Sequence, residues 1–247
     1  MKQLQFFLIL FPSILFSQQT KSVDFKTVDA VISVNPIYKS VSGTVNYTFE
    51  VFSKIDTIRI DAKNMDFTEV RINDKVCNFK NSTKELLLFE GFKKGKNTVR
   101  FEYIATPKQT MYFVGEGENL QIWTQGQGKY TSHWFPSFDD MNEKVIFNTT
   151  ITYDKNYEVI SNGILENKAE SGNNFIWNYK MKKPMSSYLL MLAIGKFEKQ
   201  TLTSASGTPL ENYISPEDVS KFEPTYRYTK QIFDFFEKEI GVNYPWE

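Results

Sequence analysis

The chain has 247 residues, and its 29 lysine and arginine residues are balanced by 29 aspartate and glutamate residues. This length suffices for one large domain, or for one domain and part of another, and the balanced charge excludes the basic surface that nucleic acids or an anionic membrane require. One cysteine, Cys77, excludes an internal disulfide, and we expect it to be a small buried hydrophobe.

Residues 1–17 have the pattern of a secretory signal peptide. Lys2 supplies the positive start, the run Phe6–Phe16 is apolar but too short to span a bilayer, and Ser17 is a small residue at the expected cleavage point. A buried N-terminal strand is the alternative interpretation. No other segment is apolar enough to cross a membrane. The sequence therefore predicts an exported protein, either periplasmic or secreted, with no membrane span.

From residue 22 to about residue 200 the chain is predicted to form strand after strand. Short alternating or aromatic-rich runs are separated by turn signals, which indicates a β-sandwich or an extended curved sheet. The predicted strands are Phe25–Val34, Gly43–Val51, Thr57–Ile60, Thr68–Ile72, Leu86–Phe89, Asn97–Tyr103, Thr110–Val114, Leu120–Thr124, Val145–Tyr153, Tyr157–Ser161, Phe175–Met181 and Tyr188–Phe197.

The pattern changes after residue 200. The stretch Thr203–Pro209 has the composition of a linker or a hairpin turn. The pair Ser215–Pro216 then predicts a helix start, and apolar residues at helical spacing over Phe222–Ile240 predict an amphipathic helix. Pro224 is expected to separate a short turn from the long helix, and Gly241 to end it.

The segment Trp123–Lys144 is the strongest candidate for a binding loop. It places Gly126 and Gly128 among several bulky aromatic residues, and glycine lets another chain approach the backbone closely. Loops of this composition, held by aromatic anchors, are where binding residues concentrate.

His133 is the only histidine, which leaves little room for metal or triad chemistry. Zinc sites of the usual kinds need several histidine, acidic or cysteine ligands, and the sequence has no His-Glu-x-x-His motif. A Ser-His-Asp triad would have to use Ser132 and Asp139, but neighbours on an extended segment point to opposite faces. We therefore expect no metal site and no catalytic residue in this chain, and we expect His133 to be a packed or hydrogen-bonded loop residue.

Two pairs of acidic residues offer a different chemistry. Asp139 with Asp140, or Glu116 with Glu118, resembles the paired carboxylates of glycoside hydrolysis. One alternative is therefore a secreted β-sandwich glycosidase or carbohydrate binder. Turn formation and solvated charge are the simpler interpretation of these residues, and we assign Asp139 and Trp134 to the shape of the loop.

Several motifs, in order along the chain, resemble the aminopeptidase N family of zinc metallopeptidases. The central one is Thr124–Gln127 followed by Trp134–Asp139, with Lys144 and Phe147 after it. The resemblance covers nearly all of the chain beyond residue 22. The other segments that carry it are Val41–Val45, Ile60–Lys63, Lys183–Leu190, Gly195–Phe197 and Asp234–Pro245.

This resemblance implies both an architecture and a function. It implies a β-sandwich or saddle-like N-terminal domain over residues 22–200, followed at residues 201–247 by a linker and the first helix of an α-rich catalytic domain. That domain would bind zinc through two histidines and a glutamate, and a second glutamate would activate the metal-bound water. Gln127, together with Gln125, matches the position that holds the free amino end or first residue of a peptide substrate. The implied partners are such peptides and the protein's own catalytic domain.

The chain departs from the family pattern in three respects. Ser137 stands where the family usually has cysteine, and Ser132 or His133 occupies the region of a common arginine. The Gly-x-Met-Glu-Asn and His-Glu-x-x-His motifs are expected beyond Glu247. A stand-alone, secreted, non-catalytic β-rich binding module is the alternative, and it predicts a soluble monomer. An incomplete enzyme predicts instead that helix Phe222–Ile240 exposes an apolar face and promotes aggregation.

Overall fold

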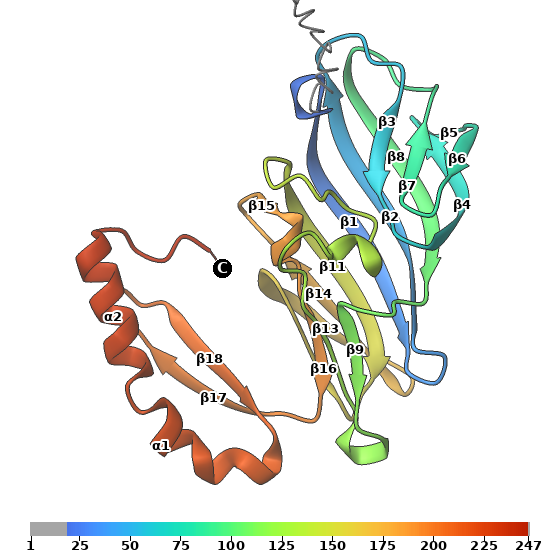
Figure 1. Ribbon diagram of the computed structural model, residues 1–247. Coiled ribbons are helices and arrows are strands. Elements are labelled where there is room, and N and C mark those ends of the chain that lie inside the picture. The colour runs from blue at the N-terminus through green and yellow to red at the C-terminus, as the bar shows by residue number, and fades with distance from the viewer. Residues whose placement is uncertain (1–18, 247) are drawn as a thin grey trace, which may run out of the picture.

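The computed structural model describes residues 19–246 and consists mainly of β-strands, arranged over that range in four sheets (Figure 1). The predicted mainly β fold is confirmed. The predicted signal peptide at residues 1–17 lies outside the described residues, and no helix within them has the length and apolar content to span a membrane. Short 3-10 helices interrupt the β-rich body at η1 (Gln19–Lys21), η2 (Gly117–Asn119), η3 (Thr131–His133) and η4 (Ser187–Leu189).

The largest sheet has nine strands and supports the rest of the β-rich body. Parallel pairing occurs between β1 and β11, and the other neighbours are antiparallel. Buried and exposed residues alternate along the strands, so one face of the sheet carries the core. The order is β13 (Ile164–Ser171), β14 (Asn174–Lys180), β11 (Lys144–Asp154), β1 (Val23–Asn35), β2 (Ser40–Val51), β8 (Gly95–Ala105), β4 (Met65–Ile72) and β5 (Lys75–Val76), and β15 (Met185–Ser186) pairs with β11 off this path.

Two smaller sheets share a single hydrophobic core with the large one. Buried residues of all three sheets belong to one contiguous cluster, as expected for a layered β domain. The four-stranded sheet has the order β12 (Glu158–Ser161), β16 (Leu192–Gly195), β10 (Gln121–Thr124) and β9 (Met111–Val114), and the three-stranded sheet has the order β3 (Ile58–Asp61), β7 (Glu85–Leu88) and β6 (Phe79–Asn81).

The C-terminal part stands to one side of this β-rich body (Figure 1). It consists of a hairpin, β17 (Glu198–Thr203) and β18 (Pro209–Ile214), then η5 (Pro216–Lys221), α1 (Phe222–Tyr226) and α2 (Thr229–Ile240). Gly241 adopts the left-handed conformation, with φ of 73°, and ends α2 as predicted. The Asp234 carboxylate accepts the Ala205 N–H at 2.7 Å, which joins α2 to the hairpin turn.

The structure differs from the predicted elements in a few places. The predicted strand Tyr188–Phe197 is shorter, because η4 occupies its beginning and the strand proper is β16. β13 was not predicted, because nearly all of its residues are exposed and several are charged. Its sequence therefore lacks the alternation of apolar and polar residues that marks a half-buried strand. The predicted boundary at residue 200 falls inside β17, and the stretch predicted as linker or hairpin turn connects β17 and β18. Cys77 is half-buried rather than fully buried.

Candidate functional site

The candidate site is built on the segment of residues 125–139, which follows β10 and contains η3. We call it the 125–139 loop. Its apolar side packs into the core, where Trp134, Phe135 and Phe138 are all buried. The Phe138 ring centroid lies 4.3 Å from that of Phe25 on β1, and the Phe135 centroid lies 6.0 Å from that of Tyr103 on β8. Aromatic packing of this kind fixes the loop on the inner face of the large sheet.

The beginning of the loop is equally close-packed. A β-carbon added to Gly126 would lie 2.3 Å from Thr131 Oγ1 and 2.7 Å from the Tyr188 carbonyl oxygen, so only glycine fits there. The Thr131 hydroxyl donates a hydrogen bond of 2.9 Å to the Ser187 carbonyl oxygen. The Gln125 N–H donates one of 2.8 Å to the Thr110 carbonyl oxygen. The turn at residues 127–130 is therefore held at both ends.

Gln125 and Gln127 are both exposed at this turn. Neither side chain makes a hydrogen bond to another residue in the described part of the chain, 19–246. Gln127 lies directly after buried Gly126 and before Gly128, whose φ is 83°. The loop thus presents two amide side chains, each able to donate and accept, on a backbone that is firmly anchored on its other side.

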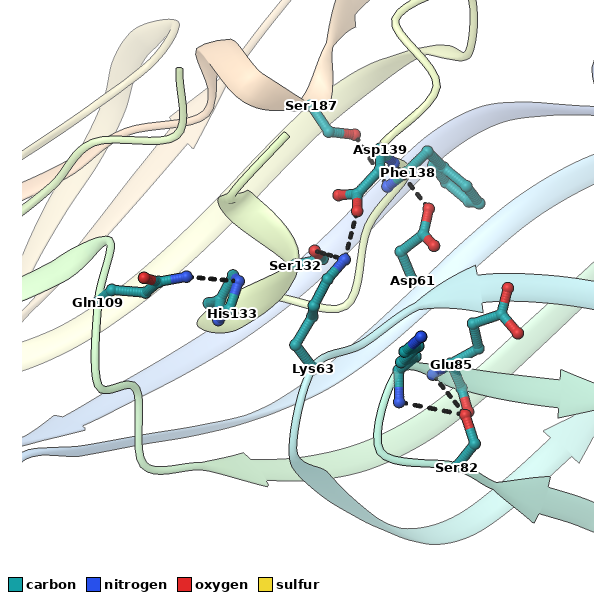
Figure 2. A network of polar contacts seen from close by, with 11 residues as sticks. Asp61, Lys63, Ser82, Glu85, Gln109, Ser132, His133, Phe138, Asp139 and Ser187 are labelled. Atoms are coloured by element: carbon teal, nitrogen blue, oxygen red, sulfur yellow. Dashed lines mark hydrogen bonds and ion pairs between the residues drawn. The ribbon is translucent and has the colours of Figure 1, made fainter. Parts of the chain in front are cut away.

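A polar cluster holds the other end of the loop (Figure 2). Lys63 Nζ lies 2.5 Å from the Asp139 carboxylate and 3.3 Å from Ser132 Oγ. The Asp139 N–H donates a hydrogen bond of 2.7 Å to the Asp61 carboxylate. Asp139 and Trp134, both assigned to loop shape from the sequence, have contacts that suit that role.

Burial and charge set the protonation of two groups in this cluster. Burial raises the pKa of Asp61 to about 6, and the Asp139 carboxylate adds to that rise, while the Asp139 N–H and Lys63 oppose it. Burial and the Lys63 ammonium lower the pKa of His133, while the Asp139 carboxylate opposes that shift, and the net effect favours the neutral imidazole.

The structure does not assemble a serine triad. Ser132 and His133 lie in η3, not on the extended segment assumed from the sequence, and they have different partners. Ser132 Oγ accepts from Lys63, whereas His133 Nε2 lies 2.9 Å from the amide nitrogen of Gln109 (Figure 2). His133 is therefore a hydrogen-bonded loop residue, as predicted.

Three of the four acidic residues considered for glycoside hydrolysis have other partners. Asp139 is paired with Lys63, the Asp140 carboxylate accepts the Asn142 N–H at 2.9 Å, and Glu118 is paired with Lys196. Within residues 19–246, no group of three or more histidine, cysteine, aspartate or glutamate side chains is placed to hold a metal ion.

Sequence reasoning missed two features around this loop. It assigned Ile60–Lys63 to an opening strand and did not predict that Asp61 and Lys63 contact the 125–139 loop. It also missed Glu143, which is 3% exposed and accepts the Phe25 N–H at 3.0 Å. Burial raises the pKa of Glu143 to about 7, with the nearby Asp24 and Asp140 adding to the rise. No local pattern marks either feature, because the partners are distant in sequence.

Comparison with known protein families gives a match over most of the β-rich body. The family model of the peptidase M1 N-terminal domain matches residues 26–189, which include the 125–139 loop and most strands of the β-rich body. Strand β16 follows the matched range. The chain belongs to the peptidase M1 N-terminal domain family. The resemblance seen in the ordered motifs is thereby confirmed.

Relatives of this M1 N-terminal domain carry aminopeptidase names. Glutamyl aminopeptidase of Sus scrofa is 37% identical over 113 residues, and that of Homo sapiens is 32% identical over 111 residues. Each match covers 44% of this chain and 12% of the relative. Leucyl aminopeptidase of Saccharolobus solfataricus is 25% identical over 197 residues, covering 79% of this chain and 25% of the relative. The chain thus spans only a small part of the length of these relatives.

Proposed function

We propose that this chain is the N-terminal part of an exported, zinc-dependent aminopeptidase, which removes the first residue from peptides. The match to the peptidase M1 N-terminal domain over residues 26–189 carries the proposal, and the aminopeptidase names of the relatives support it. Export is proposed from the signal-like residues 1–17 alone.

In this proposal the M1 N-terminal domain supports the catalytic domain and contributes Gln127 to the substrate cleft. Two observations support that role: the Gln127 side chain is exposed and has no partner in residues 19–246, and the backbone beneath it is anchored by close packing at Gly126. A polar group that must be matched on binding distinguishes a free amino end from an internal peptide bond. Gln125, two residues earlier, is the second candidate for the same contact.

Zinc would bind outside this chain. The described residues offer no cluster of ligands for a metal, so none of them is assigned to the ion. When bound in the catalytic domain, zinc would activate the water that attacks the first peptide bond. The residues of this chain would hold and orient the substrate.

The apolar surface of α2 supports the presence of a partner domain. Ile232, Phe235, Phe236 and Ile240 are all more than half exposed. Exposed apolar patches of this kind mark sites of contact with protein. We propose that the rest of the catalytic domain, of which α2 would be the first helix, covers this face. A stand-alone binding module would leave the face in water.

The deciding experiment begins with the source reading frame beyond codon 247. We expect it to continue through Gly-x-Met-Glu-Asn and His-Glu-x-x-His motifs. The full product should cleave glutamyl or leucyl chromogenic substrates, lose activity with a chelator, regain it with zinc, and leave N-acetylated substrates intact. An immediate stop codon, together with the intact mass of the native protein, would overturn the proposal in favour of a non-catalytic binding module.

A further inference from the structure

The segment Asp61–Lys63, which includes the last residue of β3 and the two residues after it, binds the 125–139 loop through its backbone. The Asp61 N–H and carbonyl oxygen are each 2.9 Å from their partners on Ser137, which forms an isolated antiparallel bridge. The Lys63 N–H donates a hydrogen bond of 2.7 Å to the Ser132 carbonyl oxygen. Two points of the loop, five residues apart in sequence, are therefore tied to one short segment.

The side chains of the same segment add a charged contact. Lys63 Nζ bridges the Asp139 carboxylate at 2.5 Å and the Ser132 hydroxyl at 3.3 Å, as Figure 2 shows. Among the ion pairs within residues 19–246, this one has the least exposed members, with 27% of Lys63 and 18% of Asp139 accessible. Partial burial makes water and salt screen this pair less than the exposed pairs elsewhere on the surface.

A series of contacts through Ser132, Thr131 and Gly126 connects Lys63 with the turn that carries Gln127. Ser132 is fully buried, and its neighbour Thr131 is the residue against which Gly126 packs. The Tyr130 N–H donates a hydrogen bond of 3.1 Å to the Gly126 carbonyl oxygen, closing the turn that carries Gln127. We therefore expect a displacement of Ser132 to shift Thr131 and to loosen the turn, because the close contacts at Gly126 leave little room for independent movement.

We propose that Lys63 is a positioning residue for Gln127: by bridging Ser132 and Asp139 it holds η3, and through η3 the turn that presents Gln127 to substrate. The inference rests on the proposed function of Gln127. It extends that function to a residue far from Gln127 in sequence that makes no contact with the Gln127 side chain. Such preorganisation matters because binding groups lose effect when their geometry is loose.

Hydrogen exchange on the 247-residue chain tests the structural half of this proposal. Lys63→Met keeps the side-chain length and removes the charge, and Lys63→Arg keeps the charge. We expect amides of residues 126–135 to exchange about tenfold faster in Lys63→Met, to recover in Lys63→Arg, and to leave the amides of β8 unchanged.

Lys168→Met is the matched control, because Lys168 is 29% exposed and pairs with Glu158 at 2.9 Å, away from the loop. It should not alter exchange at residues 126–135. Unchanged exchange there in Lys63→Met, or an equal rise throughout the large sheet, would overturn the proposal, since the second result describes a general stabiliser.

A double-mutant cycle in the full aminopeptidase tests the functional half. We expect Lys63→Met to lower kcat/KM about tenfold in the wild type and to have no further effect in Gln127→Ala. Independent, multiplicative losses would overturn the proposal, because Lys63 would then act without Gln127. An unchanged kcat/KM in Gln127→Ala alone would instead refute the proposed role of Gln127 and the positioning role with it, and the exchange data would then describe only a structural clamp.

Discussion

The Tyr47 hydroxyl, fully buried on β2, donates a hydrogen bond of 2.7 Å to the carbonyl oxygen of Pro136 in the 125–139 loop. Pro136 is buried, as are the residues on either side of it, so its carbonyl oxygen depends on a protein donor for its hydrogen bond. Residues 89 positions apart in sequence are joined by a single buried contact that ties the large sheet to the candidate site.

Tyr47→Phe should therefore lower the free energy of unfolding by about 1–2 kcal/mol, the cost of leaving a buried carbonyl unpaired. Urea denaturation measures it. Tyr103→Phe is the matched control, because the Tyr103 hydroxyl is also buried but has no partner within residues 19–246. That variant should lose no stability, and equal losses in both variants would mean that the Tyr47 hydrogen bond contributes nothing.

Ser137→Cys should stabilise the chain by about 1 kcal/mol. The Ser137 hydroxyl is buried and has no hydrogen-bond partner within residues 19–246, and a thiol is less costly to bury than a hydroxyl. Ser187→Cys provides the contrast, because the Ser187 hydroxyl accepts the Phe138 N–H at 3.3 Å. Thermal or urea unfolding should show a gain for the first variant and a loss for the second. A loss in both would show that the Ser137 hydroxyl is satisfied in solution.

Gln127→Ala in the full enzyme should lower kcat/KM roughly 5- to 150-fold, which corresponds to roughly 1–3 kcal/mol of transition-state binding. The stability of the 247-residue chain should not change, because the side chain is exposed. Gln125→Ala, assayed beside it, decides which amide makes the contact. Retention of full activity by Gln127→Ala with a simple aminoacyl substrate would remove Gln127 from the site.

Glu143→Gln should change how stability depends on pH. Burial raises the pKa of folded Glu143 from 4.5 to about 7, so its favourable contribution is complete below about pH 4.5 and is lost as the pH rises through about 7. The stability of Glu143→Gln relative to wild type should therefore rise by about 3 kcal/mol between pH 4.5 and pH 8. Urea unfolding across that range measures the difference. A difference that stays constant with pH would show that Glu143 ionises normally.

A polar substitution on α2 should reduce self-association of the 247-residue chain. Phe236 is 55% exposed within the apolar face of that helix, and such a face associates in water when nothing covers it. Sedimentation velocity at several concentrations should show less association for Phe236→Lys than for wild type. Val76→Lys is the control, because Val76 is 70% exposed on β5 and should have no effect. A wild-type chain that stays monomeric at all concentrations would favour the stand-alone binding module.

The sequence by itself determined the local elements and the identity of the candidate loop. Alternating burial marked the main strands because a strand between core and solvent must alternate. The Ser215–Pro216 pair and Gly241 marked the ends of the C-terminal helical region because those residues suit special backbone conformations wherever they occur. The proposed role of Gln127 rests on an ordered motif, which needs no knowledge of the fold.

Only the tertiary structure decided how distant segments meet. The parallel pairing of β1 with β11 joins segments that are far apart in sequence. The local pattern of each strand shows which face is buried but not which strand lies beside it. The same is true of the contact between Lys63 and Asp139, 76 positions apart, and of the burial of Glu143 against β1. Lys63 and Asp139 are partly buried and Glu143 is fully buried, although nothing in the local sequence marks them. Burial depends on how the whole core packs and not on the residue alone.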